Sequence, residues 1–228
     1  MKKLAITVNV ILAAALLIGT VLYQTVGGKT VHYSTSGVFV LMGVVNLIFA
    51  LISRAKGLRF YISMSIGLIL CMLGDILLSK DFVTGAATFA LGHVCYFAAY
   101  CFQQKLRMTD LLIGGVLFCA ASAFLIFCPL LQFDAVYLRW VCLAYALIIS
   151  LMVGKAAGNY LADRSICRLL LTIGSVTFFF SDLMLVFNWF MDTGKMTGRL
   201  CMITYFPAQC FLGLAMLVSI FFTKPTKG

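Results

Sequence analysis

Stretches of about 20 residues that carry almost no charge recur along this chain of 228 residues, and they constrain its fold more than any other feature. A helix needs about 20 mainly apolar residues to cross a bilayer. A closed β-barrel would show short alternating strands rather than continuous apolar runs. We therefore predict an all-α, polytopic membrane protein with eight transmembrane helices. The expected spans are Leu4–Tyr23, Ser36–Ser53, Arg59–Leu78, Val83–Phe102, Thr109–Cys128, Ala135–Gly154, Arg168–Phe190 and Leu200–Phe222.

Composition supports this interpretation. The chain is 63% hydrophobic and 11% charged, whereas a soluble domain is roughly 45–50% apolar and about 25% charged. The segments between the spans are short, and none has the composition of a soluble domain or a linker. We therefore expect one transmembrane domain over residues 1–228. The basic start and apolar centre of the first span would also fit a secretory signal. We favour an uncleaved span, because it makes the topology below consistent.

The basic residues predict the orientation. The net charge is +10, but the basic residues are dispersed among the loops, so we expect no nucleic-acid partner. Lys and Arg are enriched in cytoplasmic loops of membrane proteins. If the N-terminus is cytoplasmic, twelve of the 17 basic residues lie inside, and eight spans bring the C-terminus to the same side. We predict a multi-pass protein of the cell membrane with both termini in the cytoplasm. The twelve are Lys2, Lys3, Arg54, Lys56, Arg59, Lys105, Arg107, Lys155, Arg164, Arg168, Lys224 and Lys227.

The third and seventh spans share a pattern. "SIGLILCMLGDILL" at 65–78 aligns without gaps with "TIGSVTFFFSDLML" at 172–185, and the match includes Asp75 and Asp182. The following spans correspond as well, with His93 in "FALGHVCYF" and Gln209 in "YFPAQCFLG". We predict a parallel repeat of four plus four helices, as known in some transporters. It would place the two Asp residues at equal depth, facing one cavity.

Polar side chains inside the spans are the candidate site. A charged group in mid-bilayer costs roughly 2.5–3.5 kcal/mol on insertion scales, so such groups usually face the protein interior and have a function. Two buried carboxyls that face one cavity can share a proton, which gives one acid and one carboxylate for general acid–base catalysis. Asp75 and Asp182 are the predicted catalytic pair. The predicted substrate-binding residues are His93, Tyr96, Tyr205 and Gln209.

The same segments resemble the YhhN-like lysoplasmalogenase family. The similar pieces are "LGDILL", "ATFALGHVCYFAAY", "GSVTFFFSDLMLVF" and "YFPAQCFLGLAM", in spans three, four, seven and eight. Family members often carry a Lys-Pro pair near the start of span two, where this chain reads "HYSTSGVFVLMG". The resemblance implies an ether hydrolase that acts on lysophospholipids. It would cleave the vinyl ether bond of lysoplasmalogens to a fatty aldehyde and glycerophosphoethanolamine or glycerophosphocholine, without a cofactor or metal.

Other classes of function remain open. Buried acids and a parallel repeat also suit a proton-coupled transporter of a small or lipid-like solute. A third class is a lipid-binding or structural membrane protein without chemistry. A zinc-dependent lipid hydrolase would need several His ligands, and the chain has only two His residues. The nine cysteines lie almost all within the spans and are interpreted as small packing residues.

Overall fold

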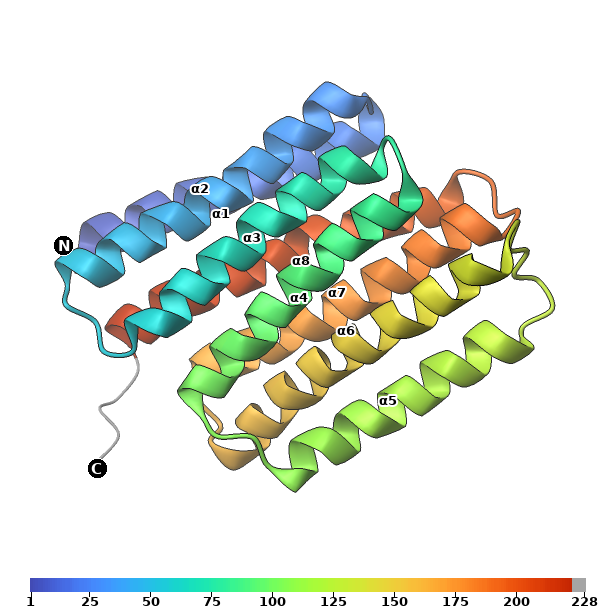
Figure 1. Ribbon diagram of the computed structural model, residues 1–228. Helices are drawn as coiled ribbons and strands as arrows, with labels where there is room; N and C mark the ends of the chain where they lie inside the picture. Colours follow the sequence, from blue (N-terminus) through green and yellow to red (C-terminus); the bar gives the residue numbers. More distant parts are fainter. Residues whose placement is uncertain (223–228) are drawn as a thin grey trace.

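The computed structural model describes residues 1–222. Within this range the chain forms eight α-helices and no strand (Figure 1). Each helix is long and apolar enough to cross a membrane, which confirms the prediction of an all-α protein with eight transmembrane helices. The helices are α1 (Lys2–Thr25), α2 (Lys29–Ile52), α3 (Leu58–Leu78), α4 (Phe82–Gln103), α5 (Met108–Phe127), α6 (Val136–Ala162), α7 (Ile166–Phe190) and α8 (Met196–Phe221).

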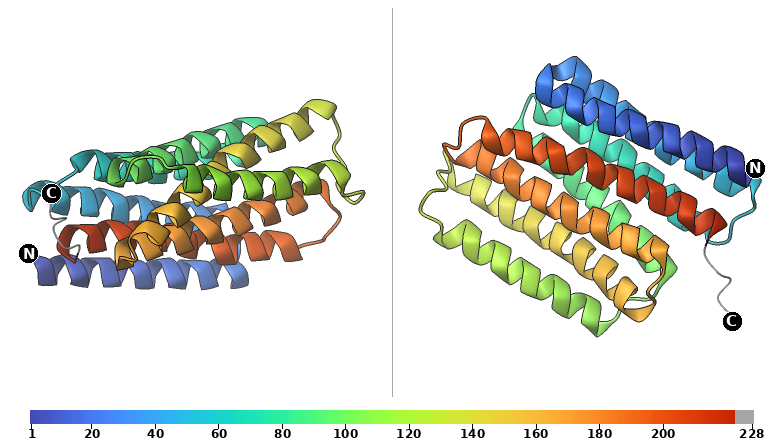
Figure 2. Two further views of the ribbon diagram at one scale, coloured as in Figure 1. Left: turned by 90° about the horizontal axis from the view of Figure 1, so that it is seen from below. Right: turned by 180° about the vertical axis from the view of Figure 1, so that it is seen from behind.

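Six helices form a closed ring, and two lie outside it. Around the ring, α2 packs on α3, α3 on α4, α4 on α6, α6 on α7, α7 on α8, and α8 returns to α2. Helix α1 packs outside on α2 and α8, whereas α5 packs mainly on α6. Figures 1 and 2 show α5 at the edge of the bundle in two opposite views. The polar residues of the spans therefore have a protein interior to face.

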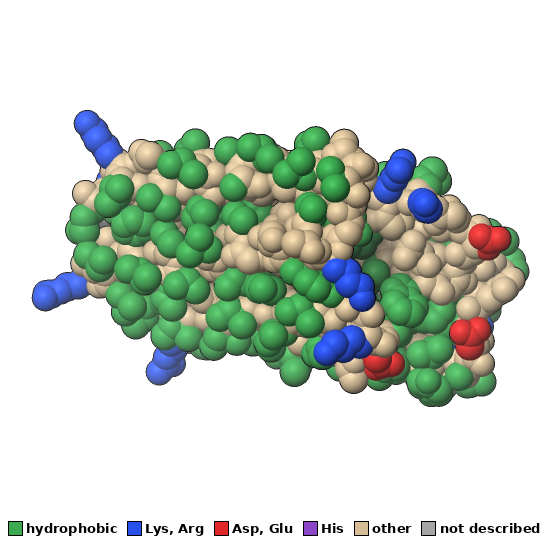
Figure 3. Space-filling model, turned by 90° about the horizontal axis from the view of Figure 1, so that it is seen from above, with side chains coloured by type: hydrophobic (Ala, Val, Ile, Leu, Met, Phe, Trp, Pro, Cys, Tyr) green, Lys and Arg blue, Asp and Glu red, His purple; other side chains and the backbone are tan. Residues whose placement is uncertain are grey.

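Both ends of the described chain lie at the same end of the bundle. The ammonium group of Lys2 lies 4.0 Å from the centre of the Phe222 ring. On the face shown in Figure 3, charged side chains gather toward the two ends of the molecule, and Asp residues appear only toward one of them. This distribution fits the expected orientation, and the cytoplasmic location of the termini stays a prediction. Lys224 and Lys227, two of the twelve basic residues expected inside, lie outside the described residues.

Small residues allow close helix contacts at equivalent places in the two halves. A Cβ atom on Gly67 of α3 would lie 2.5 Å from the Tyr96 ring of α4. A Cβ atom on Gly174 of α7 would lie 2.8 Å from Leu212 of α8. Both pairs follow the alignment of the two segments, and α4 packs on α6 as α8 packs on α2. These contacts are those that a repeat of four plus four helices would produce, and the symmetry axis itself stays a prediction.

Two helices extend well beyond the apolar runs. Helix α2 begins at Lys29 rather than Ser36, so His32 is part of a helix. Helix α6 continues to Ala162, and Lys155, expected in a loop, is fully buried within it. The Lys155 ammonium donates to Asp110 Oδ2 at 2.7 Å and to the Lys105 carbonyl at 2.9 Å. A buried charge is tolerated when it is paired in this way. A span predicted from a run of apolar residues ends at the first charged residue, so it missed this part of α6.

Candidate active site

Asp182 on α7 is the centre of one buried polar cluster. Its side chain is 9% exposed, and the His93 side chain on α4 is fully buried. The Tyr145 hydroxyl on α6 donates to Asp182 Oδ2 at 2.6 Å. The His93 Nε2 atom lies 3.1 Å from the same oxygen and 2.7 Å from the Tyr145 oxygen. Because α6 packs on both α4 and α7, three helices bring these side chains to one carboxyl oxygen.

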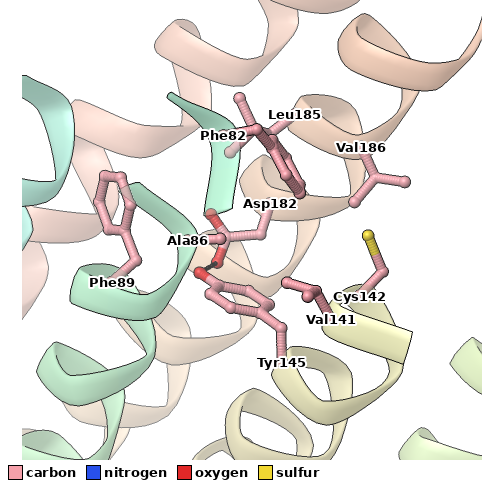
Figure 4. A pocket seen from close by; sticks show the side chains of 9 residues that line it. All are labelled: Phe82, Ala86, Phe89, Val141, Cys142, Tyr145, Asp182, Leu185 and Val186. Atoms are coloured by element: carbon pink, nitrogen blue, oxygen red, sulfur yellow. Dashed lines mark hydrogen bonds between the residues drawn. The ribbon is translucent and has the colours of Figure 1, made fainter. Parts of the chain in front are cut away.

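Asp182 also lines two narrow pockets. One pocket of about 20 Å³ lies between α4, α6 and α7. Figure 4 shows this pocket, with the hydrogen bond between Tyr145 and Asp182 beside Phe82 and Val141. The other, of about 40 Å³, lies between α5, α6 and α7. Volumes of this size hold only a few water molecules. No hydrogen bond within residues 1–222 reaches Asp182 Oδ1, so this second oxygen is free to act on a molecule in a pocket.

A further carboxyl, that of Asp81, lies at the N-terminus of α4. Asp81 precedes Phe82, which lines the smaller pocket, and accepts a hydrogen bond from the Thr84 backbone N–H at 2.8 Å. This backbone contact, with the Thr84 side chain, lowers the pKa of the exposed Asp81 carboxyl. Asp81 is the N-cap residue of α4. Its carboxyl is therefore ionised near neutral pH, and the negative charge stabilises the first turn of the helix.

Asp75 on α3 is the centre of a second cluster. Its side chain is buried, and Oδ2 accepts hydrogen bonds from Ser36 of α2 and from the Tyr205 hydroxyl of α8, the latter at 3.0 Å. His32 Nε2 lies 3.2 Å from Asp75 Oδ1, but the orientation of the imidazole ring does not meet the geometry of a hydrogen bond. Polar groups from α2 and α8 thus surround the Asp75 carboxyl.

Aromatic rings separate the two clusters. Phe178 lies 4.6 Å from the His93 ring and 5.3 Å from the Tyr205 ring, measured between ring centres. Phe89 contacts both Phe178 and Tyr205. The two carboxyls share no hydrogen-bond partner, and Asp75 lines neither of the pockets at Asp182. The expectation of two carboxyls that face one cavity therefore stays a prediction, and any joint action would cross this ring layer.

The remaining predicted site residues pair with each other. Tyr96 and Gln209 are fully buried, and the Tyr96 hydroxyl donates to Gln209 Oε1 at 3.0 Å. Two nitrogens of the site, His93 Nδ1 and Gln209 Nε2, are buried without a hydrogen-bond partner among the described residues. An unpaired buried polar atom costs roughly 1–3 kcal/mol. These two nitrogens are therefore places where a substrate oxygen or a water molecule would be stabilised.

Three residues of the clusters were not predicted. Tyr145, Ser36 and His32 contact the carboxyls, yet their sequence neighbourhoods contain no acid or paired motif. Ser36 begins an expected span and His32 precedes it, so both looked like interfacial residues. Tyr145 lies in an apolar run with other aromatic residues. Only the packing of α2 on α3 and of α6 on α7 brings these residues to the site. Among residues 1–222, no three His, Cys or Asp side chains gather as metal ligands do.

The fold and the two clusters define a polytopic membrane protein with buried carboxyl sites inside its helix bundle. The chain belongs to the YhhN family, whose family model matches residues 35–216. This confirms the resemblance found in the sequence. The matched region contains Asp75 and Asp182 with their hydroxyl donors, whereas His32 lies outside it. No curated protein and no solved structure matches the chain.

Proposed function

We propose that this protein is an integral-membrane hydrolase that cleaves the vinyl ether bond of lysoplasmalogens. The observation that carries the proposal is the buried Asp182 carboxyl, held through Oδ2 by His93 and Tyr145 with Oδ1 left free. A carboxyl placed in this way at bilayer depth is suited to proton transfer to a lipid. The resemblance to lysoplasmalogenases supplies the substrate class, and membership of the YhhN family supports it.

Asp182 is the proposed general acid. Protonated at Oδ1, it gives its proton to the β-carbon of the vinyl ether, and the electrons of the double bond form the new C–H bond. The α-carbon then carries an oxocarbenium cation. Water adds to that carbon, and the resulting hemiacetal collapses to a fatty aldehyde and the glycerol hydroxyl. The proton released by water returns to the Asp182 carboxylate, so atoms and charge balance over the cycle.

Asp75 is the proposed electrostatic partner. As a carboxylate bonded by Ser36 and Tyr205, it stabilises the cation that forms on the substrate. Charges interact strongly where water is excluded, so the effect reaches across the ring layer without direct contact. His93 Nδ1 and Gln209 Nε2 are both buried and unpaired: Gln209 Nε2 is the proposed donor to a glycerol oxygen, and His93 Nδ1 is the proposed acceptor for a glycerol hydroxyl or the attacking water.

The decisive experiment is an assay on the purified protein in mixed micelles with lysoplasmenylethanolamine. We expect release of free fatty aldehyde from the wild type and its loss in Asp182→Asn. Asn keeps the shape of the side chain but has no proton to transfer as an acid. A saturated alkyl-ether lysolipid is the control substrate, since it has no double bond to protonate. Absence of aldehyde release from folded wild-type protein would refute the hydrolase proposal, and proton-driven solute uptake into liposomes would then identify a transporter.

A further inference from the structure

An apolar groove runs along the outside of the bundle between α5 and α7. The backbone of α5 packs on α6 and not on α7, so α6 forms the floor of the groove between α5 and α7. Figure 1 shows α7, α6 and α5 in this order toward the edge of the bundle. The groove has a volume of about 450 Å³, within the range of ligand sites. Its lining includes Leu112 and Val116 of α5, Val153 and Ala157 of α6, and Val176 and Phe179 of α7.

The groove leads toward the candidate active site. Phe179 lines both the groove and the narrow pocket at Asp182. That pocket continues along the same three helices, past Ala121 on α5 to Tyr145 on α6. The groove and the carboxyl are thus parts of one path, in which the wide section lies far from Asp182 and the narrow section beside it.

The length and chemistry of the path suit one hydrocarbon chain. Ala157 on the groove floor and Tyr145 at the site are 12 residues apart on α6, which corresponds to about 18 Å along a helix. One leaflet of a bilayer has a hydrocarbon thickness of about 15 Å, half of the 30 Å core. The groove lining contains only apolar side chains. A single alkyl chain that runs parallel to the helices would fill it from end to end.

We infer that this groove binds the hydrocarbon chain of a lysolipid and positions its first carbons at Asp182. The inference rests on the proposed function, because it assigns the chain of that substrate. The lysolipid enters sideways from the bilayer between α5 and α7, without passing through water. Transfer of the chain from lipid into an apolar groove gains little free energy, so the groove selects by shape and length rather than by affinity.

The path narrows at Phe179, so entry needs a local movement. Phe179 is half-buried, and α5 packs mainly on one neighbouring helix, α6. A rotation of the Phe179 ring or an outward shift of α5 would join the groove to the pocket at Asp182. Either movement breaks few contacts, because the backbones of α5 and α7 do not approach each other. A ring contact between Phe124 and Phe187 joins the two helices.

Ala157→Phe tests the inference. A phenyl ring on the floor fills the far end of the groove, so the ratio of kcat/KM for a hexadecenyl to an octenyl lysoplasmalogen should fall by about tenfold or more. Ala14→Phe on α1 is the matched control, because Ala14 is exposed on a helix remote from the groove. It should leave the ratio unchanged. An unchanged ratio in Ala157→Phe would overturn the inference.

A labelling experiment separates the groove from the hydrolase activity. A saturated ether lysolipid with a photoreactive group at the end of its chain cannot be hydrolysed at a vinyl ether. Its labels should concentrate on α5 and the second half of α6, and Ala157→Phe should reduce them severalfold while Ala14→Phe does not. Labels at this place in a protein without aldehyde-releasing activity would refute the proposed function and retain the groove. Labels spread evenly over all lipid-facing helices, or a groove covered by a second copy of the chain, would refute the groove.

Discussion

Replacing Tyr145 with Phe removes one hydroxyl from the candidate site and leaves the ring in place. That hydroxyl donates to Asp182 Oδ2 at 2.6 Å and contacts His93 Nε2 at 2.7 Å. A hydrogen bond to a charged group contributes roughly 1.5–3 kcal/mol. If this contribution is made in the transition state, kcat should fall by about 10- to 150-fold. The measurement is aldehyde release from lysoplasmenylethanolamine, with kcat and KM determined separately.

Tyr100→Phe is the matched control for this prediction. Tyr100 is fully buried on α4. Its hydroxyl forms a hydrogen bond with the Ser175 hydroxyl at 2.9 Å, but it contacts neither carboxyl. Both variants lose one buried hydrogen bond, so their thermal stabilities in detergent should fall by similar amounts. Only Tyr145→Phe should lose turnover with little change in KM. Full activity in Tyr145→Phe, or an equal loss in Tyr100→Phe, would refute the positioning role of Tyr145.

Three further predictions concern the acids, the packing and the topology. Asp182→Asn and Asp75→Asn should each lower kcat, by roughly 10²–10⁴-fold for the proposed general acid Asp182. The pH profile of the wild type should be bell-shaped, because the mechanism needs Asp75 ionised and Asp182 protonated. Asp75→Asn should remove the acidic limb of this profile. A retained acidic limb would reject that assignment. Gly154→Ala should destabilise the fold by about 1–3 kcal/mol, because its Cβ would lie 2.5 Å from α5 backbone atoms. Gly115→Ala is the control: its Cβ would meet no atom within 4 Å, so the unfolding temperature should stay unchanged or rise. Accessibility tags at both chain ends should report the cytoplasm, and one external tag would contradict the predicted orientation.

The sequence alone was sufficient for the eight spans and for the inward position of the acids. A helix satisfies its backbone hydrogen bonds within itself, so an apolar run of sufficient length specifies a span without knowledge of its neighbours. An acid in such a run must avoid lipid, which is why the burial of Asp75 and Asp182 followed from their positions. His93 and Tyr96 are three residues apart, a spacing that puts both on one face of α4, and both are fully buried.

The partners of each acid were decided only by the tertiary structure. Periodicity fixes which residues of one helix share a face, but lipid-facing and protein-facing sides of a membrane helix are both apolar, so the pattern does not say which helices meet. The ring order of the bundle brings Tyr145 to Asp182 and Ser36 to Asp75. It also places Phe178 between the two clusters, a packing of rings from different helices that the alignment of two segments does not reveal.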